Sequence, residues 1–199
     1  QTLFDKVWAQ HVVSDLGGDT ALLHIDRHIM HDLGAPRGLA EIERLGRKVR
    51  NPELVFATPD HAISSAPGRT DDTNPIAGRF LRELRRRASE TGIRYFDLGQ
   101  EGQGIVHVVG PELGISLPGL TIVCGDSHTC THGGLGAIAF GIGTSELTHV
   151  LATQTLVQRK PRRMRVRFEG STAAGVTPKD MILHLIGRIG AAAGTGFAV

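Results

Sequence analysis

Short apolar runs alternate with amphipathic segments along the 199-residue chain. Four of these runs are bounded by polar or glycine-rich residues, which is typical of β-strands. They cover residues 20–26, 54–57, 95–98 and 121–124. Alternating apolar and polar residues predict another strand over 164–169, and residues 194–199 resemble a turn into one more.

Capping residues predict where several helices begin. Thr2 with Asp5 starts a helix whose apolar stripe is Leu3, Phe4, Val7, Trp8 and Val12. Asn74 and Pro75 start a longer helix that stops at Gly92, and Thr177 caps a last one, with the apolar stripe Ile182, Leu185, Ile186 and Ile189. Further helices are expected over 144–157 and, by a narrow preference over a strand, 105–109. A helical turn is expected around His28, Met30 and His31.

This alternation of strands and helices predicts an α/β fold with a largely parallel sheet covered on both faces. A length of 199 residues with 40% hydrophobic and 21% charged content suits one large globular domain. The arginines form two local clusters, residues 82–87 and 159–167, which we expect to be solvated faces. No aromatic residues are interleaved with them, so nucleic acid is not an expected partner.

The chain has no apolar window long enough for a membrane helix, and it lacks the pattern of a signal peptide. We therefore expect a cytoplasmic protein. Its two cysteines, Cys124 and Cys130, are too few for a disulfide framework and are expected to be reduced thiols.

Candidate chemistry follows the strand at 121–124, where the apolar run gives way to Gly125-Asp126-Ser127-His128 and then to a glycine-rich segment. In α/β folds, ligands bind just beyond such strand ends. The pair Asp60-His61 repeats the pattern after the strand at 54–57, and His107 begins a third segment. An aspartate can orient a histidine and raise its pKa, so we expect these segments to meet as an acid–base site. His11, His24 and His184 are expected to be structural.

Three other chemistries were weighed. A serine hydrolase is disfavoured because Ser127 lies in no G-x-S-x-G elbow, and adjacent residues of an extended chain point to opposite faces. Nucleotide binding is disfavoured because the glycines match no phosphate-binding pattern. A zinc-binding protein or hydrolase is the rival from another class, since Cys124, His128, Cys130 and His132 are acceptable zinc ligands, although their spacing matches no familiar zinc motif.

The motifs together resemble the aconitase superfamily, and within it the large subunits of bacterial-type 3-isopropylmalate dehydratases. The resemblance covers residues 2–199, and the segments that carry it are 56–61, 104–107, 123–129, 140–146 and 177–180. It implies an incomplete three-layer aconitase-like domain. It also implies a hydro-lyase that isomerises 2-isopropylmalate and 3-isopropylmalate in leucine biosynthesis, with homoaconitase and citramalate-type dehydratases as alternatives.

The resemblance also implies roles for individual residues. Asp60, His61, His107, Asp126 and His128 match catalytic positions, and Ser127 and His128 match substrate-binding ones. The family uses a [4Fe-4S] cluster, one iron of which acts as a Lewis acid. Its cysteine ligands are expected downstream of this chain, so neither Cys124 nor Cys130 maps onto a ligand. The base is expected on a serine of a small partner subunit that carries the swivelling domain.

The lack of matching cluster ligands predicts that the chain is the N-terminal part of a larger subunit, truncated before the cluster-ligand region. The isolated chain is expected to be inactive. It is also expected to hold no cluster alone and to form a heterodimer with the small subunit when complete.

Overall fold

The computed structural model describes residues 1–199 and divides into two compact units, Gln1–Gln158 and Arg159–Val199. The first unit contains the two larger sheets and the candidate site, and the second contains one helix and a sheet of two short strands. No helix in the structure combines the length and the apolar character needed to cross a membrane.

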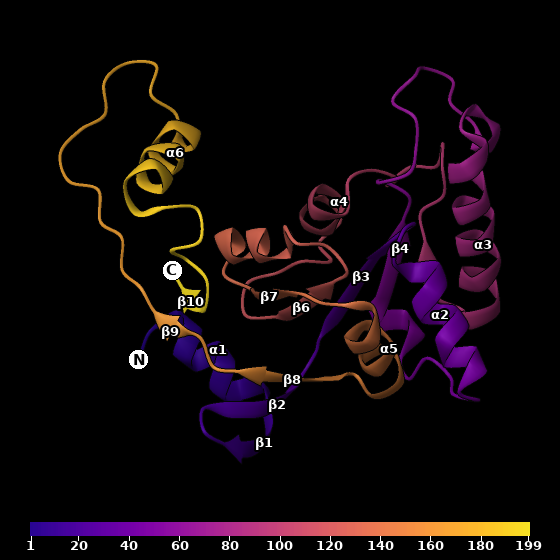
Figure 1. The fold of residues 1–199 in the computed structure, drawn as a ribbon, viewed down its shortest axis with the longest axis horizontal. Helices are drawn as coiled ribbons and strands as arrows, with labels where there is room; N and C mark the ends of the chain where they lie inside the picture. Colours follow the sequence, from indigo (N-terminus) through magenta and orange to yellow (C-terminus); the bar gives the residue numbers. More distant parts are fainter. The chain divides into compact units, whose positions relative to one another are not determined.

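A five-stranded parallel sheet forms the centre of the first unit (Figure 1). Its strand order is β5-β4-β3-β6-β7, and every neighbouring pair is parallel. The strands are β3 (Arg27–His31), β4 (Val55–Thr58), β5 (Arg94–Tyr95), β6 (Thr121–Cys124) and β7 (Ile138–Gly141). The predicted parallel α/β fold is confirmed, although the third predicted strand, 95–98, shrinks to β5.

The helical turn predicted around His28 is wrong, because Arg27–His31 is the central strand β3. Four consecutive residues of this strand are buried, since helices cover both faces of the sheet. A strand buried on both faces shows no alternation of apolar and polar residues, so its periodicity is uninformative. Strand β7 was not predicted either, because its four residues lie among glycines.

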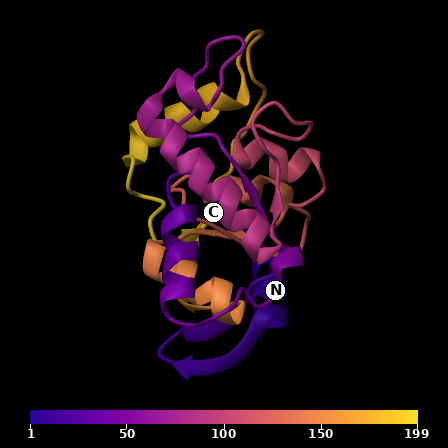
Figure 2. The same ribbon diagram turned by 90° about the vertical axis from the view of Figure 1, so that its right-hand side faces the viewer.

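Side chains on the two faces of the sheet pack into different hydrophobic cores, so the sheet lies between two layers of helices. Met30, Ala57 and Val123 face one core together with the helices α2, α3 and α5. Ile29, Phe56 and Ile122 face the other core, which is completed by α4. The helices are α2 (Ala35–Arg44), α3 (Pro75–Thr91), α4 (Val106–Glu112) and α5 (Thr144–Thr153). Figure 2 shows α2, α3 and α5 grouped together.

The ends of α3 and α5 follow from local chemistry. Asn74 Oδ1 accepts from the N–H groups of Ile76 and Ala77, and Gly92 ends α3 in the left-handed conformation, as the sequence predicted. The helix predicted over 144–157 was too long, because Gln154 has a φ of 59° and ends α5. The remaining residues enter β8 (Thr155–Arg159).

A smaller layer lies at the amino-terminal end of the chain. Helix α1 (Leu3–His11) has the predicted capping box between Thr2 and Asp5. It is followed by the antiparallel hairpin of β1 (Val12–Gly17) and β2 (Thr20–His24), and β8 joins β2. Only Val7 and Trp8 of the predicted stripe are buried; Leu3 is exposed and Val12 already belongs to β1. Short 3-10 helices cover Pro52–Leu54, Asp71–Thr73 and Thr129–Leu135.

The arginines of α3 do not simply face solvent, as the sequence had suggested. Arg85 pairs with Asp71 at 2.8 Å and also with Asp97, and these contacts raise its pKa. Arg87 pairs with Glu43 of α2 at 2.8 Å, and its side chain is only 11% exposed. Two of these arginines therefore tie α3 to its surroundings.

The second unit pairs β9 (Arg162–Arg163) with β10 (Phe197–Ala198) in parallel and carries α6 (Pro178–Ile189). The capping box at Thr177 and the terminal strand are confirmed. The strand predicted over 164–169 is wrong, because those residues form no strand. No residue of α6 is buried, so its predicted apolar stripe is not matched by a core in this structure.

Candidate functional site

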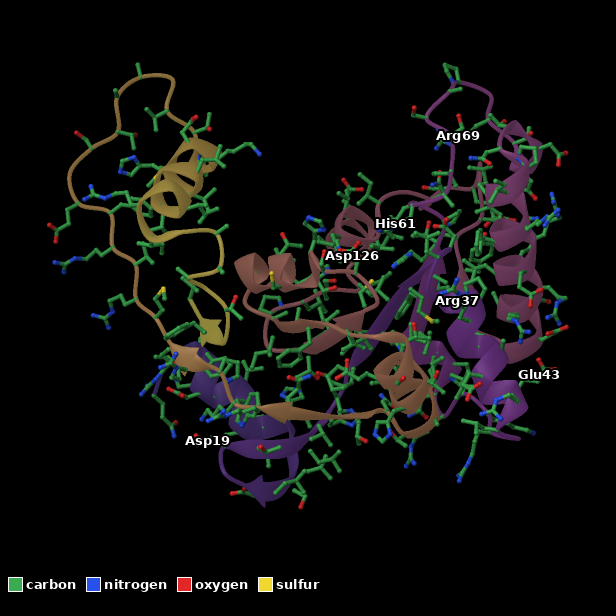
Figure 3. All side chains as sticks on the ribbon, in the orientation of Figure 1. Asp19, Arg37, Glu43, His61, Arg69 and Asp126 are labelled. Carbon is green, nitrogen blue, oxygen red and sulfur yellow. The ribbon has the colours of Figure 1, made fainter.

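Polar residues gather where β4 and β6 end, on either side of the central strand β3. Asp60 and His61 follow β4, whereas Asp126, Ser127 and His128 follow β6. His107 comes from the first turn of α4. Figure 3 shows His61 and Asp126 close together above the sheet.

The Asp126 carboxylate is the centre of this cluster. Its Oδ2 lies 2.8 Å from His61 Nε2, and its Oδ1 lies 3.2 Å from His107 Nε2 and 3.1 Å from His128 Nδ1. Only 9% of the Asp126 side chain is exposed. The three segments predicted from the sequence therefore meet in space, while their catalytic roles stay predictions.

Two carboxylates favour the protonated form of His61. Its Nδ1 contacts Asp60 Oδ1, and its Nε2 contacts Asp126 Oδ2. Carboxylates accept hydrogen bonds and do not donate them, so both contacts are hydrogen bonds only when both ring nitrogens carry a proton. Partial burial disfavours this charge, but Asp60 and then Asp126 outweigh the burial and raise the pKa of His61.

Asp126 is held ionised by its neighbours. Burial on its own disfavours the charge, but the His128 N–H at 2.5 Å and the His107 and His128 side chains together lower the pKa of Asp126 well below its usual range. The site therefore combines a carboxylate whose ionised form is favoured with a histidine whose protonated form is favoured.

A buried aspartate that the sequence analysis did not select fixes the loop after β4. Asp32 Oδ1 accepts hydrogen bonds from the N–H groups of Asp60 and His61 at 2.8 and 3.0 Å, and its Oδ2 accepts one from Ala62 at 2.6 Å. Asp60 Oδ2 in turn accepts from Val106 N–H at 2.9 Å and so anchors the start of α4. Together these carboxylates set the position of His61.

His31, at the end of β3, was also missed. Its ring stacks on that of His61 with centroids 3.9 Å apart, and its Nε2 lies 3.1 Å from the Gly125 carbonyl oxygen. The pair His31-Asp32 repeats the pattern of an apolar run that ends in a histidine and an aspartate. That repeat was the sequence signal for both residues, and the wrong assignment of β3 hid it.

His132 is the third missed residue, since the sequence analysis considered it only as a zinc ligand. Its ring is buried, and its Nε2 lies 3.0 Å from His107 Nδ1. Burial, and secondarily the neighbouring His107, lower the pKa of His132 to about 4. His132 is thus a neutral partner behind the cluster at neutral pH.

A glycine allows the backbone to pass close to Asp126. A Cβ atom at Gly141, the last residue of β7, would lie 2.5 Å from the Asp126 carbonyl oxygen. Any side chain there would displace the turn that carries Asp126. Gly141 therefore serves the packing of the turn that carries Asp126.

Ser127 and His128 are exposed, as is His61. The premise used against a serine hydrolase is wrong in one respect, because residues 126–128 form a turn, and Ser127 Oγ lies 3.5 Å from His128 Nδ1. That distance is at the limit of a hydrogen bond, and His128 Nδ1 is nearer to Asp126. Both side chains are exposed beside the Asp126 carboxylate, and their substrate-binding role stays a prediction.

The zinc alternative finds no support in the geometry. Among Cys124, His128, Cys130 and His132, two side chains are buried and two are exposed, and they form no converging group of ligand atoms. The group that does converge, His31, Asp32, Asp60 and His61, has ligand atoms within 4.8 Å of one another. Both oxygens of Asp32 accept backbone N–H groups, so the Asp32 carboxylate has hydrogen-bond partners without a cation.

The iron–sulfur cluster implied by the resemblance does not fit the cysteines of this chain. Such clusters are held by several cysteine thiolates. Cys124 is buried in β6, and desolvation followed by the nearby aspartates raises the pKa of its thiol to about 12; Cys130 is exposed. These 199 residues therefore do not provide a cluster site.

Comparison with known proteins identifies the family of this chain. The model of the aconitase family (aconitate hydratase) matches residues 5–199. A protein named 3-isopropylmalate dehydratase large subunit 1, from Bradyrhizobium diazoefficiens, is 62% identical over 199 residues, which are all of this chain and 42% of that relative. The chain thus spans less than half the length of the relative. Since the family model covers nearly the whole sequence, this chain belongs to the aconitase family.

Proposed function

We propose that this chain carries acid–base residues of a hydro-lyase that interconverts 2-isopropylmalate and 3-isopropylmalate by dehydration and rehydration, a step of leucine biosynthesis. The 62% identity to a dehydratase large subunit supports the substrate assignment. The observation that carries the proposal is the Asp126 carboxylate, which contacts three histidines beyond the end of β6.

Dehydration of a hydroxy acid requires a proton for the departing hydroxyl group. His61 is suited to hold that proton, because its pKa is raised and its side chain is 33% exposed at the edge of the site. We infer that the proton moves from the His61 ring to the leaving oxygen and returns from water in the hydration step. Asp60 and Asp126 orient the ring in both directions.

Ser127 and His128 are proposed to bind the substrate. They are exposed next to Asp126, and the His128 N–H is fixed by the Asp126 carboxylate. A hydroxyl and an imidazole are suitable hydrogen-bond partners for the carboxylate and hydroxyl groups of a hydroxy acid. His107 and Asp126 are proposed to tune the acid–base chemistry from the inner side of the site.

Members of the aconitase family generally bind a [4Fe-4S] cluster. Since the cysteines described here do not fit one, we propose that residues of the complete large subunit outside this chain hold the cluster. We also propose a small subunit with the swivelling domain as partner, in keeping with the name of the relative. The isolated 199-residue chain is then expected to be inactive.

The test uses the complete large subunit, assembled anaerobically with its small subunit and assayed through the absorbance of the unsaturated intermediate. We expect turnover of 2-isopropylmalate and a loss of about 10²–10⁴-fold in kcat in H61Q. His149, exposed on α5, provides the matched control, and H149Q should retain the activity. An active H61Q enzyme would contradict the role of His61.

The same assay addresses substrate identity. Homoaconitase and citramalate-type substrates are offered in parallel at equal concentration. A preference for either would reject the isopropylmalate assignment and leave the acid–base cluster in place.

A further inference from the structure

The ring of His107 has a single aligned hydrogen bond, and His132 provides it. His107 Nδ1 lies 3.0 Å from His132 Nε2. His107 Nε2 is within ion-pair distance of Asp126 at 3.2 Å, but it is buried and has no hydrogen bond of acceptable geometry. Asp126 therefore attracts a proton to Nε2 without fixing the ring, which leaves His132 to fix it.

We propose that His132 is a positioning residue, which donates its Nε2–H to His107 Nδ1 and so holds the His107 ring with its Nε2 proton toward Asp126. The catalytic use of this contact rests on the proposed function, whereas the contact itself is argued from the geometry. A negative carboxylate beside Nε2 favours a proton on that nitrogen, so Nδ1 is the acceptor in the neutral ring. The partner must then be a donor, and a neutral His132 can carry its proton on Nε2.

The surroundings of His132 agree with this assignment. Its ring is 1% exposed, and its Nδ1 is buried without a hydrogen-bond partner. A proton on that nitrogen would be a buried donor without an acceptor, which favours the tautomer with the proton on Nε2. The lowered pKa of His132 also favours a neutral ring, which carries one proton.

Helix α4 leaves room for this contact. Gly110 lies three residues after His107, on the same side of the helix. A Cβ atom at Gly110 would lie 3.2 Å from His132 Cε1 and 2.5 Å from Ser116 Oγ. The absence of a side chain at this position allows His132 to lie against the helix that carries His107.

The first test measures the hydrogen bond in the 199-residue chain with ¹⁵N-labelled histidine, independently of any activity. Two-bond ¹H–¹⁵N correlations at pH 7 identify the protonated nitrogen of each ring, and H107Q assigns the signals. We expect a proton on His107 Nε2, together with a trans-hydrogen-bond ¹⁵N–¹⁵N coupling between His107 Nδ1 and His132 Nε2. Absence of that coupling in the wild-type chain would overturn the proposal.

The second test separates positioning from packing. H132F fills the space without a donor, whereas H132Q places an amide N–H near the position of Nε2. We expect the His107 ring to lose its fixed orientation in H132F, seen as exchange broadening of its ring signals, and to keep that orientation in H132Q. His107 ring signals as sharp as those of the wild type in a folded H132F chain would mean that His132 only fills space. If H132F does not fold, the wild-type coupling and the H132Q spectrum decide the question.

Discussion

Two aspartate-centred clusters occupy opposite ends of the parallel sheet. At the amino ends of the strands, Asp26 Oδ2 lies 2.7 Å from His11 Nε2 and accepts hydrogen bonds from Thr121 N–H and Oγ1 at 2.8 and 3.0 Å. At the carboxyl ends, Asp126 contacts His61, His107 and His128. Both use a carboxylate and histidine, so residue type alone does not tell a structural cluster from a candidate site.

The difference lies in what surrounds each carboxylate. Asp26 connects α1 to the start of β6 and also receives backbone and hydroxyl groups, so its partners belong to the scaffold. The partners of Asp126 are mainly imidazoles, and His61 and His128 reach the surface. Ligands of parallel α/β folds bind at the carboxyl ends of the strands, which is where Asp126 lies.

The strongest test of this comparison is the removal of charge from Asp126. D126N keeps the shape of the side chain but removes the carboxylate that His61 and His107 face. We expect kcat of the complete large and small subunit assembly to fall by about 10²–10⁴-fold. D19N, at the exposed turn of the β1–β2 hairpin, is the matched control (Figure 3). Full activity of D126N would refute the catalytic side of the comparison.

The corresponding change at the amino end should affect stability. D26N weakens the contacts to His11 and Thr121, so we expect the free energy of unfolding to fall by about 1–3 kcal/mol. Urea denaturation of the 199-residue chain measures it, with D19N again as the control. Activity per folded assembly should be retained, and a stable but inactive D26N enzyme would remove the distinction between the two clusters.

The pH dependence of the unfolding free energy extends the comparison to single histidines. His28, near the amino end of β3, has no hydrogen-bond partner for either ring nitrogen, and desolvation lowers its pKa to about 3. As the pH falls below about 6.5, His28 therefore becomes protonated in the unfolded chain but stays neutral in the folded chain. The stability contributed by neutral His28 is present above pH 6.5 and is lost as the pH falls toward 3.

H28L removes this titration. We expect the slope of unfolding free energy against pH between 6 and 4 to decrease by up to about 1.4 kcal/mol per pH unit. His61 has the opposite sign: because its pKa is raised, its contribution is present below pH 6.5 and is lost as the pH rises through its folded pKa. An unchanged acid slope in H28L would show that His28 is protonated in the folded chain.

The smallest effect is expected at Cys130, beside the Asp126 cluster but exposed. C130A should change the free energy of unfolding by less than about 0.5 kcal/mol. Metal analysis of the same variant should show no change in zinc content. A stoichiometric zinc ion that disappears in C130A would revive the zinc alternative.

Much of the fold was accessible from local patterns. The caps at Thr2, Asn74 and Thr177 marked helix starts correctly, because capping depends on residues only a few positions apart. The strands β4 and β6 were found because each is a short apolar run that ends in polar residues. β3 was missed because burial on both faces removes the periodicity on which such predictions depend.

The site was predicted in part for a similar reason. Asp60, His61 and Asp126 follow recognised strands, so their meeting beyond the sheet could be anticipated. Asp32 and His132 could not be placed in the same way. Asp32 follows β3, for which the sequence predicted a helical turn, and His132 reaches His107 across 25 residues from within a 3-10 helix.

The sequence by itself determined the α/β class, the family resemblance, most helix starts and the segments that supply acid–base groups, since these depend on local chemistry and motif spacing. Only the tertiary structure decided the strand order, which places β4 and β6 on either side of β3. It also decided that Asp126 contacts three histidines whereas Asp26 supports the scaffold. The reason is physical: burial and hydrogen-bond partners are set by residues distant in sequence, and these partners determine what an aspartate or histidine does.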